Sequence, residues 1–524
     1  MSPARALYAA TDGSTSRMAY GFVIDQTRCI GCHACTVACK SENDVPVGDF
    51  RTWVKYTEIG TFPQVKRHFS VLRCNHCTDA PCVTICPVIA LDKRPDGIVD
   101  LDRDVCIGCK SCMQACPYDA IYLNESTGGA EKCHYCAHRI DQGREPACVV
   151  VCPEQAIISG DFQNPTSKIA ELWKRPDAVV RRPEQGTAPN VHYIGADAVS
   201  LDPGKAREPD MYLWSERRFP APDYPPDIDL YPEATTVLDV NHKVHWGTPV
   251  SLYLVTKGIS AGAIALAPLI GLAATGSFVG EYLPEVVGLV FLAITLALLV
   301  LDLKRPMMFL SLLFRPNTKS WLVKGAWVLS AFGAAATGAL VARALGFDAW
   351  ANALRYVGVA LGAGAAGYTA FLFGQCEGRD LWQSRLLLPH LLFQALFLGA
   401  ITLLPALAFL PDPLHLAAFS WLILIGAGGH LALALVDAHG SHPTTNSQLA
   451  ASLLPRIPAW RGTNFRAFSL GLGLSTLTAA LAVIIVLTDL LNLPTALVLM
   501  FAAWIGAYLY EQAFVRAAQI PPLS

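Results

Sequence analysis

The segment CIGCHACTVAC (residues 29–39) and its near copy CIGCKSCMQAC (106–116) decide the fold of this chain. Two expanded versions of the unit are CNHCTDAPCVTIC (74–86) and CHYCAHRIDQGREPACVVVC (133–152). Three closely spaced thiolates hold one face of a cubane, and a fourth, three residues further on, ligates the other cluster of a pair. The four units therefore predict four [4Fe–4S] clusters. Their sixteen predicted ligands are Cys29, Cys32, Cys35, Cys39, Cys74, Cys77, Cys82, Cys86, Cys106, Cys109, Cys112, Cys116, Cys133, Cys136, Cys148 and Cys152.

Zinc sites and disulfides both fit these cysteines poorly. Structural zinc favours isolated Cys-x2-Cys pairs that share ligation with histidines. Disulfides need an oxidising compartment, and Cys-x2-Cys spacing does not suit them. The cysteines supply every ligand that four cubanes need, so we do not expect the neighbouring histidines to bind metal. The charged neighbours either tune cluster potentials or belong to a solvated surface. They are Arg28, Lys40, Lys110, Lys132 and Arg139.

The composition divides the 524-residue chain into two parts. Up to about His245 it is polar and rich in proline, and beyond that point long apolar runs dominate. The net charge of −2 gives no sign of a polyanion partner, so we do not expect nucleic-acid binding. We expect a tail at 1–20, a cluster domain at 21–196, a proline-rich linker at 197–245 and a membrane domain at 246–524. The predicted fold is a duplicated α+β ferredoxin-like domain followed by an all-α bundle of eight transmembrane helices.

Each predicted span has about the twenty apolar residues that a membrane crossing requires. The spans are 248–272, 284–301, 320–345, 350–373, 386–410, 413–437, 465–488 and 494–515. With eight spans, the cluster domain shares one side with the loops that contain Lys304, Arg305, Arg315, Lys319, Lys324, Arg379, Arg385, Arg456, Arg461, Arg466 and Arg516. The opposite loops contain only Arg343 and Arg355. Because basic loops stay inside, we predict that the cluster domain faces the cytoplasm.

The first half of the chain resembles a known family. The four cysteine groups, the segment DQTRCIGC (25–32) and PNVHY (189–193) are similar to the four-cluster electron-transfer subunits of membrane-bound molybdopterin oxidoreductases. The resemblance implies that the first group pairs with the fourth and the second with the third. It implies four ligand sets: Cys29, Cys32, Cys35 with Cys152; Cys39 with Cys133, Cys136, Cys148; Cys74, Cys77, Cys82 with Cys116; and Cys86 with Cys106, Cys109, Cys112.

The second half resembles the quinone-reactive membrane subunit of the polysulfide reductase type. The matching segments are LYLVTKG (252–258), LDLKRP (301–306) and FRPN (314–317), with Trp321. The resemblance implies a menaquinone or ubiquinone site near the cluster domain, and no haem. In some relatives His and Asn side chains near the start of the first span hold the quinone; here Tyr253 and Val250 stand at those positions.

Ionisable or polar side chains within spans are functional candidates because they are costly in lipid. Our candidates for quinone binding are Tyr253, Asp302, Tyr368 and His390, in a pocket between the first, fourth and fifth spans. Asp302 has an alternative as the partner of Arg305 in a helix-end ion pair. Only His390 and His430 are placed to ligate a haem, at different depths, so no haem is expected.

These features predict a subunit that moves electrons between the quinone pool and a separate cytoplasmic molybdopterin subunit. That partner would act on a sulfur compound, such as sulfite, or on formate, and no primary substrate site is expected in this chain. One alternative is a proton-translocating module that uses Lys257, Glu281, His430 and Asp489. Another is the electron-transfer and anchor subunit of a hydrogenase.

Overall fold

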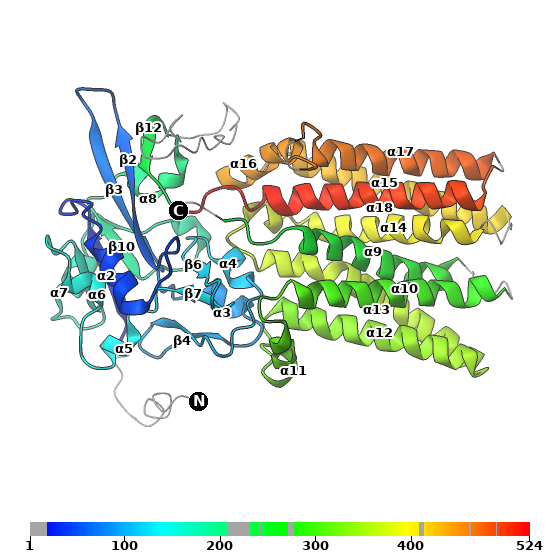
Figure 1. Cartoon of the computed structure of the whole chain (residues 1–524), viewed down its shortest axis with the longest axis horizontal. Helices are drawn as coiled ribbons and strands as arrows, with labels where there is room; N and C mark the ends of the chain where they lie inside the picture. The colour runs from blue at the N-terminus through cyan, green and yellow to red at the C-terminus, as the bar shows by residue number, and fades with distance from the viewer. Residues whose placement is uncertain are drawn as a thin grey trace.

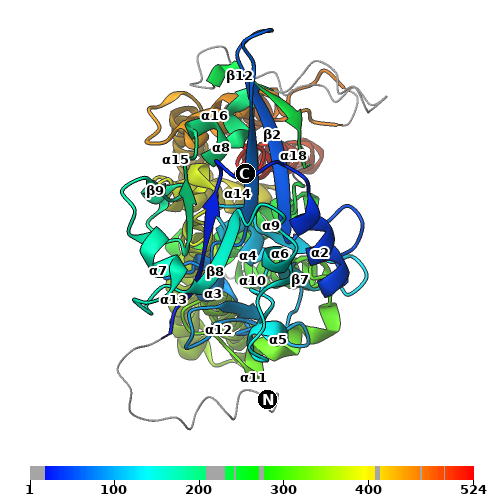
Figure 2. The ribbon, with the colours of Figure 1, turned by 90° about the vertical axis from the view of Figure 1, so that its left-hand side faces the viewer.

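The computed structural model describes residues 18–207, 231–240, 243–270, 277–407, 413–460, 463–488 and 490–524. It is elongated, with the cluster domain at one end and a bundle of long helices at the other (Figure 1). Seen from the cluster end, the short strands and helices of that domain lie in front of the bundle (Figure 2). Most of the predicted tail, part of the predicted linker at 208–230, Arg461 and Asp489 lie outside the described residues.

A four-stranded sheet forms the membrane-distal part of the cluster domain. Its order is β8-β1-β10-β9, with β1 parallel to β10 and antiparallel to β8. The strands are β1 Tyr20–Asp25, β8 Ile157–Asp161, β10 Val191–Ile194 and β9 Ala178–Val179. Phe22, Val23 and Ile24 of β1 are fully buried because both faces of the sheet are covered. Strand β1 is therefore a buried inner strand of this sheet.

A second sheet, of order β11-β12-β2-β3, crosses into the segment predicted as linker. Its strands are β2 Thr52–Ile59, β3 Lys66–Arg73, β11 Ala206–Arg207 and β12 Tyr231–Leu238. Two hairpins complete the strands: β4 Leu91–Lys93 with β5 Val99–Leu101, and β6 Ile121–Leu123 with β7 Ala130–Lys132. Since β12 pairs with β2, part of the linker is built into the cluster domain.

Short helices start within or after the cysteine loops. Four of them contain cysteines of the groups: α2 Ala34–Asn43, α3 Pro81–Ile85, α4 Ser111–Ala115 and α6 Ala147–Val150. A fifth, α5 Ala137–Ile140, follows Cys136 directly and contains none. Four others lie after the last cysteine of these groups: α7 Lys168–Trp173, α8 Ala198–Leu201 and the 3₁₀ turns η1 Pro183–Gln185 and η2 Pro203–Lys205. The predominance of four- to six-residue helices is the reason that hydrophobic periodicity did not reveal them.

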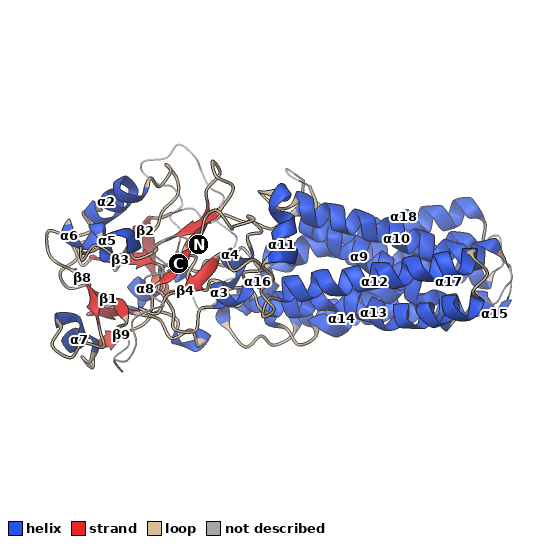
Figure 3. Ribbon diagram, turned by 90° about the horizontal axis from the view of Figure 1, so that it is seen from below, coloured by secondary structure: helices blue, strands red, loops and turns tan. Residues whose placement is uncertain are grey.

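Eight helices of the described residues are long and apolar enough to cross a membrane, as predicted (Figure 3). They are α9 Thr248–Leu269, α10 Phe278–Leu301, α12 Trp321–Ala344, α13 Asp348–Gly374, α14 Leu387–Leu407, α15 Pro413–His439, α17 Ala467–Leu487 and α18 Leu493–Ala517. Two shorter helices, α11 Ser311–Phe314 and α16 Thr445–Leu453, lie on the cluster side. Helix α10 begins before the predicted start at 284, because Pro284 is tolerated inside it.

Helix α9 is the centre of the bundle and packs on α10, α13, α14 and α18. Its contact with α14 depends on Gly262 and Gly399. A Cβ atom at Gly262 would lie 2.0 Å from the Ala395 carbonyl oxygen and 2.8 Å from the Gly399 Cα. Without a strong hydrophobic force between helices in lipid, such close backbone approach supplies the packing energy.

Backbone hydrogen bonds attach the cluster domain to the loops of the bundle. Lys304 and Arg305 donate main-chain N–H groups to the carbonyls of Gly108 (3.4 Å) and Ile107 (3.3 Å). The Arg305 guanidinium donates to the Cys106 carbonyl at 3.0 Å. Arg305 therefore holds a cysteine loop, and the alternative ion pair between Arg305 and Asp302 is not formed.

Candidate functional site

The cysteine loops repeat one backbone conformation. In the first and third groups, Gly31 and Gly108 have φ of 68° and 69°, and His33 and Lys110 have φ of 61° and 64°. Positive φ costs little at glycine and turns the loop so that consecutive cysteines face the same side. The matched angles support the predicted duplication of a ferredoxin-like unit.

The turns that follow three of the groups also match. Ile89, Asp119 and Gln155 each stand three residues after the last cysteine of a group, and all have positive φ. The turn directs the next amide back to sulfur: Ala90 N–H donates to Cys86 Sγ at 3.2 Å, and Ala156 N–H to Cys152 Sγ at 3.2 Å. N–H···S bonds stabilise thiolate charge and influence the potential of a ligated cluster.

Two of the ligand sets that the resemblance implied surround small cavities. One cavity is bordered by Cys29, Cys32, Cys35 and Cys152, and the other by Cys39, Cys133, Cys136 and Cys148. We name these sets 1 and 2. None of the seventeen cysteines forms a disulfide.

We name the two remaining sets that the resemblance implied sets 3 and 4. In set 3, Cys82 has the sulfurs of Cys116, Cys74 and Cys77 as electrostatic neighbours. In set 4, Cys112 has those of Cys109, Cys106 and Cys86, and also Cys82 of set 3. These neighbourhoods agree with the pairing that the resemblance implies, first group with fourth and second with third, which stays a prediction.

The chemistry of these sets fits iron–sulfur clusters. Burial raises the pKa of Cys35, Cys116 and Cys136 to about 11 each, and neighbouring thiolates add to the effect. Four buried thiolates need a positive group at their centre, since uncompensated buried charge is costly. The iron of a bound cluster would supply that charge.

The sets differ in exposure to solvent and in contact with the membrane domain. In set 1, Cys32 is exposed, while Cys29 and Cys152 are partly exposed. At set 4, the Trp246 indole donates to the Cys109 carbonyl at 3.3 Å, immediately before helix α9 begins. Set 1 thus faces solvent, and set 4 lies against the membrane domain.

A cavity of about 350 Å³ connects set 4 with the bundle. Cys109, Ile107 and Ser111 form its cluster-domain wall. Its other walls come from α9, α10, α12 and α13, with Val250, Tyr253, Leu299, Asp302, Leu329, Tyr368 and Leu372 among the lining residues. Three of the four predicted quinone candidates therefore border one mainly apolar cavity. The position differs from the expected one, because helices α10 and α12 line it and α14 does not.

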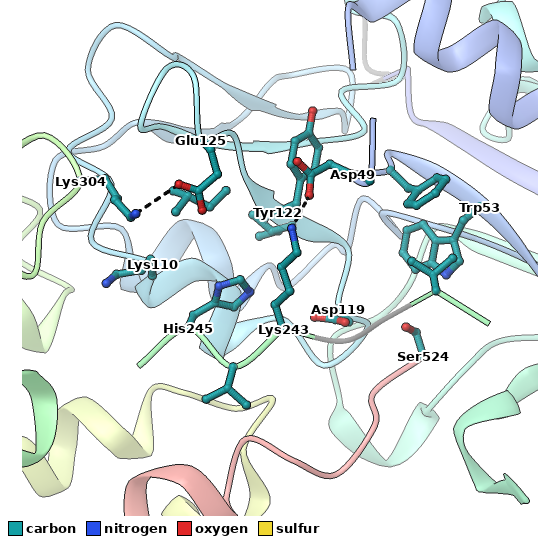
Figure 4. Close-up of a pocket in the computed structure, with 16 residues that line it drawn as sticks. Asp49, Trp53, Lys110, Asp119, Tyr122, Glu125, Lys243, His245, Lys304 and Ser524 are labelled. Carbon is teal, nitrogen blue, oxygen red and sulfur yellow. Dashed lines mark hydrogen bonds and ion pairs between the residues drawn. The ribbon is translucent and has the colours of Figure 1, made fainter. Parts of the chain in front are cut away.

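A second, more polar cavity of about 470 Å³ is lined by residues of both halves of the chain, among them Lys110, His245 and Lys304 (Figure 4). Two surface ion pairs cross its rim, Lys243 with Asp49 at 3.1 Å and Lys304 with Glu125 at 3.2 Å. Lys110 lines this cavity and pairs at 2.9 Å with Asp302, which lines the apolar one. Burial raises the pKa of Asp302, and Lys110 opposes that rise. The ion pair therefore stands between the two cavities.

His390 occupies a different place, in a buried polar cluster of α14, α15 and α18. Its Nε2 lies 2.7 Å from His430 Nδ1, and its Nδ1 lies 3.4 Å from the Tyr510 hydroxyl and 3.6 Å from Asp437 Oδ2. The two histidines are hydrogen-bonded to each other. Axial ligands instead face an iron atom between them, so this geometry does not fit a haem.

The predicted proton-route residues are not all brought together. Lys257 donates to Thr369 and lies 4.7 Å from the centre of the Tyr368 ring, behind the apolar cavity. Glu281 lies in the first turn of α10, at the end of the bundle away from the cluster domain. Nearby, Arg355 and Glu285 form a buried ion pair at 2.5 Å.

Sequence reasoning missed several residues beside the cysteine sets. Arg73, fully buried next to set 2, ends a β-strand and directly precedes Cys74. The sequence marks Trp246 only as the start of the apolar region, and Asn317 only as part of a motif. Of these three residues, only Arg73 could have been found from the sequence, because it is adjacent to a cysteine.

Comparison with known proteins agrees with this arrangement. Residues 65–162 match the family model of the 4Fe-4S dicluster domain, and residues 236–510 match that of polysulphide reductase, NrfD. Over 204 residues the sequence is 44% identical to a tetrathionate reductase subunit of Salmonella typhimurium, covering 38% of this chain and 81% of that protein.

Two further relatives match the same half. The thiosulfate reductase electron transfer subunit PhsB of Salmonella typhi is 46% identical over 168 residues, which are 32% of this chain and 86% of the relative. The arsenate respiratory reductase iron-sulfur subunit ArrB of a Shewanella species is 37% identical over 225 residues, 34% of this chain and 96% of the relative. The protein therefore belongs to the NrfD polysulphide reductase family, with an iron–sulfur electron-transfer subunit and a multi-pass membrane subunit joined in one polypeptide.

Proposed function

We propose that this protein passes electrons between a separate molybdopterin-containing catalytic subunit and membrane quinone, through four [4Fe–4S] clusters. The observation that carries the proposal is the position of Cys109. It belongs to set 4 and also borders the apolar cavity of the bundle. A cluster at set 4 and a quinone in the cavity would therefore share a wall, which is the arrangement that electron transfer requires.

The catalytic partner docks at set 1 in this proposal. The rim of set 1 carries four exposed apolar side chains around the exposed Cys32: Ile30, Val37, Val150 and Val151. Helices α2 and α6, on which Val37 and Val150 lie, pack on each other. Exposed apolar groups on neighbouring elements support a protein interface here. The relatives named for tetrathionate, thiosulfate and arsenate reduction support an oxidoreductase partner, and a sulfur compound or formate is its proposed substrate.

The quinone ring occupies the apolar cavity, with Tyr253 and Tyr368 as hydrogen-bond donors to its carbonyl oxygens. Both tyrosines are almost fully buried, and both border the cavity. Asp302 lines the apolar cavity and pairs with Lys110, which lines the polar cavity. Asp302 is therefore the proposed proton donor to the quinone at the end of the apolar cavity nearest the polar one. His390 has no contact with the cavity, so its assignment to the quinone receives no support from the geometry.

The cluster domain faces the cytoplasm in this proposal. Lys304, Arg305 and Arg379 contact the cluster domain directly. These contacts alone account for the presence of the three basic residues on this side, so they are left out of the comparison of loop charge. Eight basic loop residues still remain on this side, against two on the other. Those two are neutralised, because Arg343 pairs with Asp348 and Arg355 with Glu285. The charge asymmetry therefore persists when the docking residues are left out.

A specific observation favours proton translocation as a second candidate function. Buried polar groups continue past the cavity. Gln394 is hydrogen-bonded to Glu511, and His390 is hydrogen-bonded to His430. Lys257 and His390 are both electrostatic neighbours of Glu511. Polar side chains inside a bundle are typical of proton relays. Acidification of the lumen of sealed proteoliposomes during quinone turnover would test it, with an uncoupler as control.

The main proposal is tested by filling the cavity. Ala326 lines it from α12, and a phenylalanine there would occupy the space of the quinone ring. Ala326→Phe should abolish reduction of the clusters by a quinol analogue, while dithionite still reduces them. Ala334→Phe is the matched control, because Ala334 lies on the same helix outside the cavity lining. Equal quinol reduction in both variants would place the quinone elsewhere.

A further inference from the structure

Two buried cations lie between neighbouring cysteine sets. Arg73 ends strand β3 and is 1% exposed, and Lys132 ends strand β7 and is 2% exposed. By contrast, the buried Arg51 forms a 2.8 Å ion pair with Glu131. No ion pair with a carboxylate is formed by Arg73 or Lys132 within the residues that the structure describes.

Arg73 stands between sets 1 and 2. Its Nη1 donates to Cys148 Sγ at 3.3 Å, and its guanidinium carbon lies 4.5 Å from the centre of the Phe22 ring. It interacts electrostatically with Cys148 and Cys133 of set 2 and with Cys35 of set 1. Its Nε and Nη2 are buried and have no hydrogen-bond partner in the described part of the chain. Sulfur is therefore the principal counter-charge of this guanidinium.

Lys132 stands between sets 2 and 3. Its ammonium group donates to the carbonyls of Val99 and Cys133, the latter at 2.9 Å. The charges that act on it most strongly are those of Cys74 and Cys82 in set 3 and Cys133 in set 2, followed by the carboxylate of Asp100. Lys132 is therefore a buried cation next to sets 2 and 3, just as Arg73 is a buried cation next to sets 1 and 2.

A ligated cubane gains one negative charge when it is reduced, and the surrounding charge and burial set its potential. A cation in water is screened, but a buried cation is screened much less. An unpaired buried charge is also strongly destabilising unless an opposite charge compensates it. Ligated clusters would supply most of the negative charge that compensates both cations, and reduced clusters would supply more of it.

We propose that Arg73 and Lys132 are fixed positive charges that raise the reduction potentials of adjacent clusters. Arg73 acts on the clusters of sets 1 and 2, and Lys132 on those of sets 2 and 3. The cluster of set 2 is adjacent to both cations, so it receives the largest upward shift. The inference rests on the proposed four-cluster function and adds which residues order the potentials along the wire.

The test is a potentiometric titration of the anaerobically purified, full-length protein, followed by electron paramagnetic resonance. Replacing Cys32 or Cys136 by serine would identify the signals of sets 1 and 2. In Arg73→Gln the potentials of sets 1 and 2 should fall, and in Lys132→Gln those of sets 2 and 3. The potential of set 2 should fall further in the double variant, and set 4 should stay unchanged throughout.

Three controls separate the charge from other effects. Arg73→Lys and Lys132→Arg keep the charge and should keep the wild-type potentials. Arg28→Gln removes an exposed cation beside Cys29, where solvent screens the charge, and should shift no potential. If Arg73→Gln does not assemble, Lys132→Gln and Lys132→Arg test the inference. If Lys132→Gln does not assemble, Arg73→Gln and Arg73→Lys test it.

The inference is overturned if Arg73→Gln and Lys132→Gln shift all clusters equally, or none, at full iron content. It is also overturned if Arg28→Gln shifts set 1 as much as Arg73→Gln does. Failure of the proposed function is a different result: the wild-type protein would then contain far less iron and sulfide than four [4Fe–4S] clusters require. Iron is therefore measured before any potential.

Discussion

Asn317 offers a direct test of how the membrane domain holds set 4. Its side-chain Nδ2 lies 2.8 Å from the carbonyl oxygen of Cys86, 3.2 Å from that of Thr84 and 3.4 Å from that of Val83. These are C-terminal carbonyls of α3 and its cap, which have no partner within the helix. The Asn317 main-chain N–H also donates to the Pro87 carbonyl at 3.0 Å. The loop before α12 therefore closes the end of a cysteine helix.

The size of the effect follows from counting hydrogens. An amide nitrogen carries two, so three acceptors share two bonds. Each is worth about 1 kcal/mol, so Asn317→Ala should destabilise the attached cluster domain by about 2 kcal/mol. For a cooperative unit of about 200 residues this corresponds to a decrease of about 4–8 °C in the unfolding temperature. Asn317→Asp should cost more, because a carboxylate would replace the donor and face three carbonyl oxygens.

The assay is thermal loss of the visible cluster absorption, in detergent and without oxygen. Thr318→Ala is the control, because Thr318 is the immediate neighbour of Asn317 and none of the contacts to α3 uses its side chain. The reasoning is refuted if Asn317→Ala melts within about 1 °C of the wild-type protein, well below the expected change. It is refuted equally if Asn317→Asp is no less stable than Asn317→Ala.

Three other predictions concern the wire, the quinone and the orientation. Cys39→Ser should remove the cluster signal of set 2 and retain that of set 1, because Cys39 crosses to the later cysteines; loss of the set 1 signal alone would contradict the pairing. Tyr253→Phe and Tyr368→Phe should slow quinone turnover without changing dye-linked cluster reduction, and wild-type quinone rates in both would exclude these hydroxyls. Protease outside sealed right-side-out vesicles should leave the cluster domain intact, and a reporter after Ser524 should be active only in the cytoplasm; cleavage from outside would reverse the proposed orientation.

Local spacing and hydropathy determined the large features of this protein. Cluster ligation depends on loops of eleven to twenty residues, so the repeated cysteine groups predicted the ferredoxin-like domain and its duplication. Membrane crossing depends on about twenty consecutive apolar residues, so the eight helices were also predictable from the sequence. The pairing of the cysteine groups came from family resemblance and stays a prediction, and the cysteines of two of the four implied sets line one cavity each.

Tertiary structure alone decided which of these parts meet. Lys110 and Asp302 are 192 positions apart in sequence, and Cys109 and Trp246 are 137 apart, yet both pairs are in contact. Spacing carries no information about such contacts, so the cavity was expected beside His390 and is lined by α10 and α12. The histidines that looked like isolated candidates, His390 and His430, bond to each other. The charge of Arg73 has its proposed role because the fold buries it between two cysteine sets, where solvent cannot screen it.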